Sequence, residues 1–222
     1  MFFKNKKIHI DKNKKTVIFD FDGTIADTFE LLIDILDGYQ GDFGVEIADR
    51  ETIQRLTGKS AKDVIKELNI PFFLVPFVAY KIKNDMHDRK ERIRPFNEVI
   101  NQIKSLRKDF NIGILSNNNK KNINYFIKKY NLQDNFDFVV PVANTFGKQH
   151  ALKKLLKDNN LSNEDVVYIG DEAKDIEACK IADIKIVSVA WGFNNINILK
   201  ENNKIVINDQ KLLAKTITDS FK

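Results

Sequence analysis

Short apolar runs, separated by polar segments, set the pattern of this chain. Five of the runs have strand length and are bounded by turn residues, which is typical of buried strands in a parallel sheet. These runs are TVIFDF (16–21), IGILS (112–116), FDFVV (136–140), DVVYIG (165–170) and IKIVSVA (184–190). Between them, apolar residues recur at helical spacing. The alternation predicts an α/β protein in which a doubly wound parallel sheet lies between two helical layers.

Two of the predicted helices lie between these strands. Val99, Ile103 and Leu106 repeat at helical spacing after Pro95, a residue that suits the start of a helix. The segment KQHALKKLLKDNN shows the same spacing in its leucines, so we predict a second helix that opens at Lys148.

One connection is much longer than the others. The first strand ends near Phe21 and the second begins near Ile112, and a crossover of that length in a compact fold contains an insertion with its own structure. Apolar residues at i, i+3, i+4 and i+7 from Phe29 predict one helix of the insertion, and another starts near Pro76. The predicted domains are a core made of 1–26 and 94–222, and an inserted helical domain at 27–93.

Composition narrows the class of protein. The 222 residues are 43% hydrophobic, and the net charge of +5 comes from basic residues scattered among acidic and asparagine neighbours, so we expect no nucleic-acid partner. No apolar run reaches the roughly 18 residues of a membrane-spanning helix, and Cys179 is the only cysteine. We expect a soluble, cytoplasmic monomer or homodimer that does not bind membranes.

An acidic pair at the end of the first strand points to chemistry. In an extended strand Asp20 and Asp22 share one side, and two charges about 6 to 7 Å apart repel by roughly 2–3 kcal/mol at an effective dielectric near 20. An aspartate at a strand end is also a common turn former. A cation is the simplest compensation, and Mg²⁺ suits carboxylates that share a site with a substrate phosphate.

Three later segments place polar groups just after strands. Ser116 and Asn117 follow the second strand, Lys148 opens a later helix, and Asp171 and Asp175 follow the strand DVVYIG. Each alone could be a helix cap or a solvated charge. Together, at the rim where open parallel sheets bind ligands, they could hold a divalent cation and a phosphoryl group. We expect Asp171 and Asp175, four residues apart, to share a helical face.

The stretches DFDGTIADT, SNN, GK and GDEAKD, in that order, resemble the four motifs of the haloacid dehalogenase (HAD) superfamily of phosphohydrolases. The similarity runs from about residue 16 to 190. It implies a Rossmann-like core with three α/β/α layers, and a small helical cap of the phosphoglycolate phosphatase-like C1 type at 27–93. The family often has proline after the lysine of its third motif, where this chain has Gln149.

The resemblance also implies residue roles. Asp20 would attack phosphorus, and Asp22 would protonate the leaving alcohol and then deprotonate water. Thr24 would orient the pair, and Gly23 would permit a sharp exit from the strand beside the phosphate. The remaining implied assignments are phosphoryl binding by Ser116, the Asn117 backbone and Lys148, and Mg²⁺ binding by Asp20, the Asp22 backbone carbonyl, Asp171 and Asp175.

The sequence therefore predicts a Mg²⁺-dependent phosphatase, a phosphoric monoester hydrolase that acts on a small phosphorylated metabolite through an aspartyl-phosphate, with phosphoglycolate as a candidate substrate. Arg55 and Lys59, in the cap segment RLTGKS, would meet the non-phosphate end of the substrate. The alternatives are a phosphosugar mutase or other phosphotransferase on the same scaffold, a signalling receiver domain, and a non-catalytic binding protein.

Overall fold

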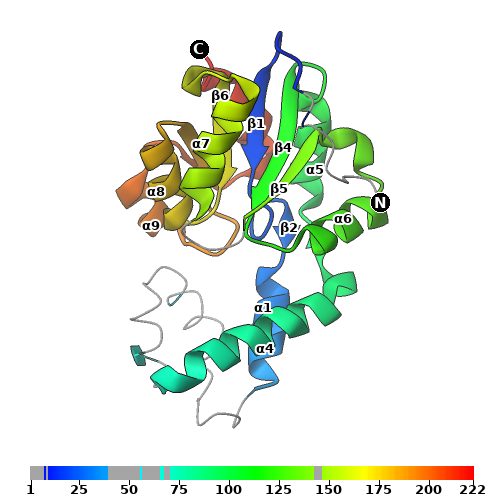
Figure 1. The fold of residues 1–222 in the computed structure, drawn as a ribbon, viewed down its shortest axis with the longest axis vertical. Coiled ribbons are helices and arrows are strands. Elements are labelled where there is room, and N and C mark those ends of the chain that lie inside the picture. The colour runs from blue at the N-terminus through cyan, green and yellow to red at the C-terminus, as the bar shows by residue number, and fades with distance from the viewer. Residues whose placement is uncertain (1–7, 9, 40–55, 57–65, 68–70, 143–146) are drawn as a thin grey trace.

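A computed structural model of the chain describes residues 8, 10–39, 56, 66–67, 71–142 and 147–222. Its main sheet has six strands in the order β5-β4-β1-β6-β7-β8, and every neighbouring pair is parallel (Figure 1). The strands are β1 (Lys15–Phe19), β4 (Phe110–Ser116), β5 (Phe138–Pro141), β6 (Val166–Gly170), β7 (Lys185–Val189) and β8 (Val206–Ile207). The strand order runs outwards in both directions from β1, so the doubly wound prediction is confirmed and the topological switch lies at β1.

Alternating side chains along each strand build a core on both faces of the sheet. Val17 and Phe19 pack on one face, and Ile18 packs on the other, as the two-residue period of a strand requires. The first face is covered by α5 (Asn97–Leu106), α6 (Lys120–Lys129) and α10 (Leu213–Asp219). The second is covered by α7 (Lys148–Asn159), α8 (Ala173–Ala182) and α9 (Ile196–Asn202). The fold is the predicted three-layer α/β/α sandwich.

The chain leaves and re-enters this core through two short strands. β2 (Ala26–Asp27) pairs antiparallel with β3 (Arg94–Pro95), so the two crossings lie side by side. Beyond them, α1 (Phe29–Asp37) packs against α4 (Val75–Asp88), and both helices lie off one end of the sheet (Figure 1). Both helices were predicted from their apolar spacing. Short 3₁₀ turns complete the described elements: η2 (Phe72–Leu74), η3 (Lys90–Arg92), η4 (Gln133–Asn135), η6 (Asn163–Asp165) and η7 (Gln210–Leu212).

The predicted and the observed strands of the main sheet differ in some of their bounds and in one strand. The first strand ends at Phe19 and not at Phe21, although the Asp20 amide still donates to the Ile169 carbonyl at 2.8 Å and extends the ladder by one bond. The sixth strand, β8, was not predicted, because Val206 and Ile207 form too short an apolar run to stand out.

Candidate active site

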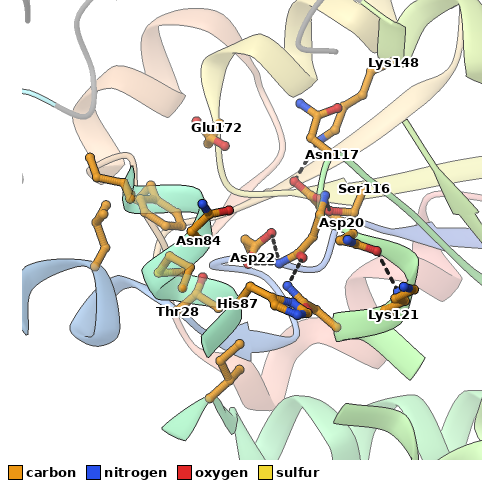
Figure 2. A pocket seen from close by; sticks show the side chains of 18 of the residues that line it. Asp20, Asp22, Thr28, Asn84, His87, Ser116, Asn117, Lys121, Lys148 and Glu172 are labelled. Atoms are coloured by element: carbon orange, nitrogen blue, oxygen red, sulfur yellow. Dashed lines mark hydrogen bonds and ion pairs between the residues drawn. The ribbon is translucent and has the colours of Figure 1, made fainter. Parts of the chain in front are cut away.

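A pocket of about 580 Å³ opens at the carboxyl end of β1, between the sheet and the inserted helices (Figure 2). Its core-side wall comes from the loops after β1, β4 and β6 and from the first residue of α7. Its other wall comes from α1 and α4, through residues such as Leu32, Ile82 and His87. The predicted Asp20, Asp22, Ser116, Asn117 and Lys148 all line it. The topology therefore brings together groups that lie far apart in the sequence.

The loop after β1 turns sharply at a glycine. Gly23 has a φ of +71°, a left-handed conformation that residues with a side chain rarely adopt. A β-carbon added there would lie 2.2 Å from an Asp171 carboxylate oxygen. Only glycine lets this loop turn back while Asp171 lies directly against it, which agrees with the predicted sharp exit from the strand.

Asp20 is the buried carboxylate of this loop. Its side chain accepts a hydrogen bond from the Phe21 amide at 2.7 Å and another from the Lys148 ammonium at 2.6 Å. Both interactions hold the carboxylate in one orientation at the floor of the pocket.

Lys148 lies between two carboxylates. Its side chain is 2% exposed and forms ion pairs with Asp20 and with Asp175. Burial alone would lower the pKa of Lys148, but the carboxylates of Asp175 and Asp20 outweigh it and raise that pKa well above its usual value. The lysine is therefore a fixed positive charge. It is paired with two protein carboxylates and also lines the pocket. Gln149, where the family often has proline, does not prevent α7 from starting at Lys148.

Three buried aspartates form a potential cation site. Asp20, Asp171 and Asp175 each present an oxygen within 4.8 Å of the others. Asp171 is further held by the Thr24 hydroxyl at 2.8 Å and by the Phe193 amide at 2.7 Å. Thr24 was expected to orient the pair Asp20 and Asp22, but its hydroxyl donates to Asp171.

The raised pKa values of two of these aspartates indicate that nearby positive charge would stabilise the ionised cluster. Burial, followed by the charges of Glu172 and Asp20, raises the pKa of Asp171 well above its usual value. Burial also raises the pKa of Asp175 to about 7, against the opposing effect of Lys148. Hard carboxylate oxygens in such a cluster fit Mg²⁺, because a divalent cation removes the repulsion that otherwise favours the protonated acids.

Asp171 and Asp175 do not share a helical face as predicted. Asp171 lies in the turn before α8, and Asp175 is the third residue of that helix. Asp175 faces back toward the turn because it closes a capping box, in which its carboxylate accepts from the Glu172 amide at 3.3 Å. The capping geometry brings the two carboxylates together.

Asp22 has a different environment from Asp20. Both of its oxygens accept from the Asn118 side-chain amide, each at 2.9 Å. Burial and the charge of Asp20 raise the pKa of Asp22 from 3.8 to about 6, despite the opposing effect of Asn118. A carboxyl group that gains and loses its proton near neutral pH is suited to acid–base chemistry.

Asn118 is a site residue that the sequence reasoning missed. It lies in the predicted segment LSNNN, two residues after Ser116, whose hydroxyl oxygen accepts from the Asn118 amide at 3.2 Å. Ser116 itself is buried, at 1% exposure. The side-chain oxygen of Asn117 is buried and has no hydrogen-bond partner among the described residues. The sequence shows a third polar residue, Asn118, in this segment. Its contact with Asp22 could not be predicted, because the two residues are 96 positions apart. Arg55 and Lys59 lie outside the described residues.

Comparison with known proteins identifies the fold and the class. The sequence model of the family described as haloacid dehalogenase-like hydrolase matches residues 17–189, so the chain belongs to this family and is a hydrolase by class. The match covers each core segment that contributes an aspartate to the site.

Individual relatives agree with this class. The chain is 27% identical over 182 residues to a phosphoglycolate phosphatase from Synechococcus elongatus, covering 82% of this chain and 86% of that protein. It is 29% identical over 181 residues to pyrophosphatase PpaX from Listeria innocua, covering 79% and 83%. A predicted phosphatase from Clostridium acetobutylicum has the same fold, with a TM-score of 0.77 at 17% identity over 93% of this chain and 99% of that chain.

None of the helices in the described part of the chain is long and apolar enough to cross a membrane.

Proposed function

We propose that the protein is a phosphatase that hydrolyses a small phosphorylated metabolite through an aspartyl-phosphate on Asp20. One observation carries the proposal: two aspartates in one loop face the same pocket in different surroundings. Asp20 is fixed by Lys148 and the Phe21 amide. Asp22 is held by Asn118 and has a pKa near 6. A nucleophile must be oriented, and a general acid must hold a proton at working pH.

The two half-reactions divide between these residues. In the first, an Asp20 oxygen forms a bond to phosphorus, the bond from phosphorus to the alcohol oxygen breaks, and Asp22 donates its proton to that oxygen. In the second, Asp22 takes a proton from water as the water oxygen attacks phosphorus, which releases Asp20 and inorganic phosphate. Asp22 returns to its starting state, so one residue serves as acid and then as base.

The polar groups around the pocket are suited to hold the phosphoryl oxygens. The Ser116 hydroxyl, the Asn117 backbone amide, the Lys148 ammonium and the Gly23 region of the loop are the proposed contacts. Phosphoryl transfer depends mainly on positioning and on stabilising charge, and Lys148 is a buried cation at the place where negative charge accumulates.

We further propose that Asp20, Asp171, Asp175 and the backbone carbonyl of Asp22 hold Mg²⁺. The bound ion would supply positive charge that offsets the phosphate dianion and the carboxylates around it. The cluster geometry and the raised pKa of Asp171 support this assignment.

The inserted segment, which we propose to be a separate cap domain at 27–93, would cover the substrate. It begins and ends where β2 pairs with β3, and α1 and α4 line the wall of the pocket opposite the carboxylates. The Synechococcus and Listeria relatives are named for phosphoglycolate and pyrophosphate hydrolysis, so both compounds are candidate substrates.

The test is a screen of phosphate release from 2-phosphoglycolate, pyrophosphate, sugar phosphates, nucleotides and an aryl phosphate, with Mg²⁺ and with chelator. We expect Mg²⁺-dependent turnover of at least one of them and its loss in Asp20→Asn, with the fold retained by circular dichroism. Isomerised sugar phosphate without free phosphate would indicate a mutase. Absence of turnover on the whole panel would indicate a binding protein.

A further inference from the structure

A chain of hydrogen bonds leads from Asp22 to the inserted helix α4. The side-chain nitrogen of Asn118, Nδ2, donates to both carboxylate oxygens of Asp22 at 2.9 Å. The side-chain nitrogen of Asn122, on α6, donates to the side-chain oxygen of Asn118, Oδ1, at 3.1 Å. The side-chain oxygen of Asn122 lies 2.6 Å from Nδ1 of His87, which is in the last turn of α4. The chain joins three segments of the protein: the loop after β1, the region from β4 to α6, and the insertion.

The carboxylate at one end fixes the direction of every bond. In its ionised form, in which it acts as the base, Asp22 only accepts hydrogen bonds, so Asn118 must turn its side-chain NH₂ group toward Asp22. Its carbonyl then faces Asn122, which must therefore donate with its own NH₂ group. The carbonyl of Asn122 faces His87, and a carbonyl oxygen requires a proton on Nδ1. The geometry thus selects the Nδ1–H form of His87 from the two neutral tautomers.

The chain is sheltered enough for these bonds to matter. Asn122 is 6% exposed, and all four residues line the same pocket. Figure 2 shows the two ends of the hydrogen-bond chain, Asp22 and His87. A buried amide that loses its partner is destabilised, so the neighbours of each amide in the chain resist its reversal. Polar networks of this kind hold one arrangement of the groups they connect.

We propose that His87 is a positioning residue: through Asn122 and Asn118 it holds the Asp22 carboxylate and couples the placement of α4 to the acid–base group. His87 comes from the insertion, and Asp22 comes from the core. When α4 packs against the core as in this structure, Asp22 has a fixed orientation. When α4 moves away, the hydrogen-bond chain loses its terminal donor, His87. The kinetic part of this inference rests on the proposed phosphatase function.

The kinetic test uses two substitutions of His87, one of which keeps a hydrogen-bond donor and one of which removes it. In His87→Asn the side-chain NH₂ can take the place of Nδ1–H, whereas His87→Phe keeps the ring shape without a donor. We expect His87→Phe to lower kcat about tenfold on an alkyl phosphate, which needs a proton on its leaving group, with KM changed less than about twofold. His87→Asn should recover most of that loss. His150→Phe, the same change at an exposed position on α7 outside the pocket, should leave kcat unchanged.

Coupling to Asp22 is tested by combining His87→Phe with Asn118→Ala. The double variant should be no slower than Asn118→Ala alone, because both changes break the same chain. Multiplied effects of the two changes, equal kcat for His87→Asn and His87→Phe, or a loss seen only in KM would each overturn the proposal.

A second measurement does not depend on activity. The chain contains three histidines, so ring ¹⁵N resonances can be assigned to His87 by comparison with His87→Asn. We expect protonated Nδ1 in the native protein and a changed Nδ1–H signal in Asn118→Ala. Neutral His87 with protonated Nε2 only, or a signal unaffected by Asn118→Ala, would contradict the chain. Failure of phosphate release with this spectrum intact would reject the proposed function and leave the hydrogen-bond chain in place.

Discussion

Asp20 and Asp22 show that two identical side chains in one loop can have separate chemical properties. Asp20 contacts a buried ammonium, and Asp22 contacts a neutral amide. A carboxylate paired with a fixed cation is held in one orientation, whereas a buried carboxyl near another negative charge holds its proton more tightly. Part of the difference comes from residues contributed by other segments, since Lys148 and Asn118 are both distant in sequence.

The raised pKa of Asp22 has a consequence for stability. Its pKa is about 6 in the folded, metal-free protein, whereas the usual pKa of an aspartate, which we take for the unfolded chain, is 3.8. The folded state therefore binds this proton more tightly than the unfolded chain. The stabilising effect is complete below pH 3.8 and is lost as pH rises to about 6. In chelator we therefore compare the unfolding free energy of Asp22→Asn with that of the native protein at two pH values. The variant's advantage should be about 1–2 kcal/mol larger at pH of about 7.5 than at pH of about 4.5. Urea unfolding at both pH values measures this; a difference independent of pH would contradict it.

Metal binding can be tested at Asp171. At Mg²⁺ about tenfold above its Kd, binding should raise the unfolding free energy by about 1.4 kcal/mol and Tm by roughly 3–6 °C. In Asp171→Asn this rise, measured from the variant's own metal-free Tm, should be small, because a neutral amide is a weaker Mg²⁺ ligand than a carboxylate. Thermal unfolding with and without Mg²⁺ measures both quantities. Asp183→Asn, an exposed position, is the control, and an equal Mg²⁺ shift in Asp171→Asn would reject the metal assignment.

At the scale of elements, apolar runs identified strands and helical spacing identified helices. The runs in β1, β4, β6 and β7 are long enough to be visible because both faces of a parallel sheet are buried. β8 has two residues and was missed. The expected common face of Asp171 and Asp175 was wrong because α8 begins at Ala173, and spacing alone does not reveal a capping box.

The end of α8 offers a stability prediction. Asp183 follows the helix with a φ of +57°, a left-handed conformation that favours glycine. Asp183→Gly should stabilise the protein by about 0.5–1 kcal/mol, since glycine adopts this conformation without steric cost. Ala182→Gly, one residue earlier within the helix, should destabilise it by about 1 kcal/mol. Urea unfolding of both variants decides the matter, and destabilisation by Asp183→Gly would contradict the conformational argument.

At the scale of the whole molecule, the order β5-β4-β1-β6-β7-β8 explains why the candidate site could be predicted in outline. Parallel strands on both sides of β1 end at one edge, so motifs after β1, β4 and β6 meet there. The predicted residues that the structure describes do gather at this edge. Asn118 could not be found in this way because its partner Asp22 is 96 positions away, and the contact of Asn122 with His87 depends on how the insertion lies over the core. The predicted monomer or homodimer and the predicted cytoplasmic location remain predictions.

The covalent step on Asp20 is the central claim, and the most direct measurement uses Asp22→Asn with an aryl phosphate and Mg²⁺. An aryl leaving group needs little protonation, so Asp20 should still be phosphorylated, but without the base at Asp22 the intermediate should persist. We predict a burst of phenolate equal to the enzyme concentration, and peptide mass spectrometry after acid quenching should place one phosphoryl group on Asp20. A phosphoryl group on another residue, or product release with no phosphorylated protein at any time, would contradict the account.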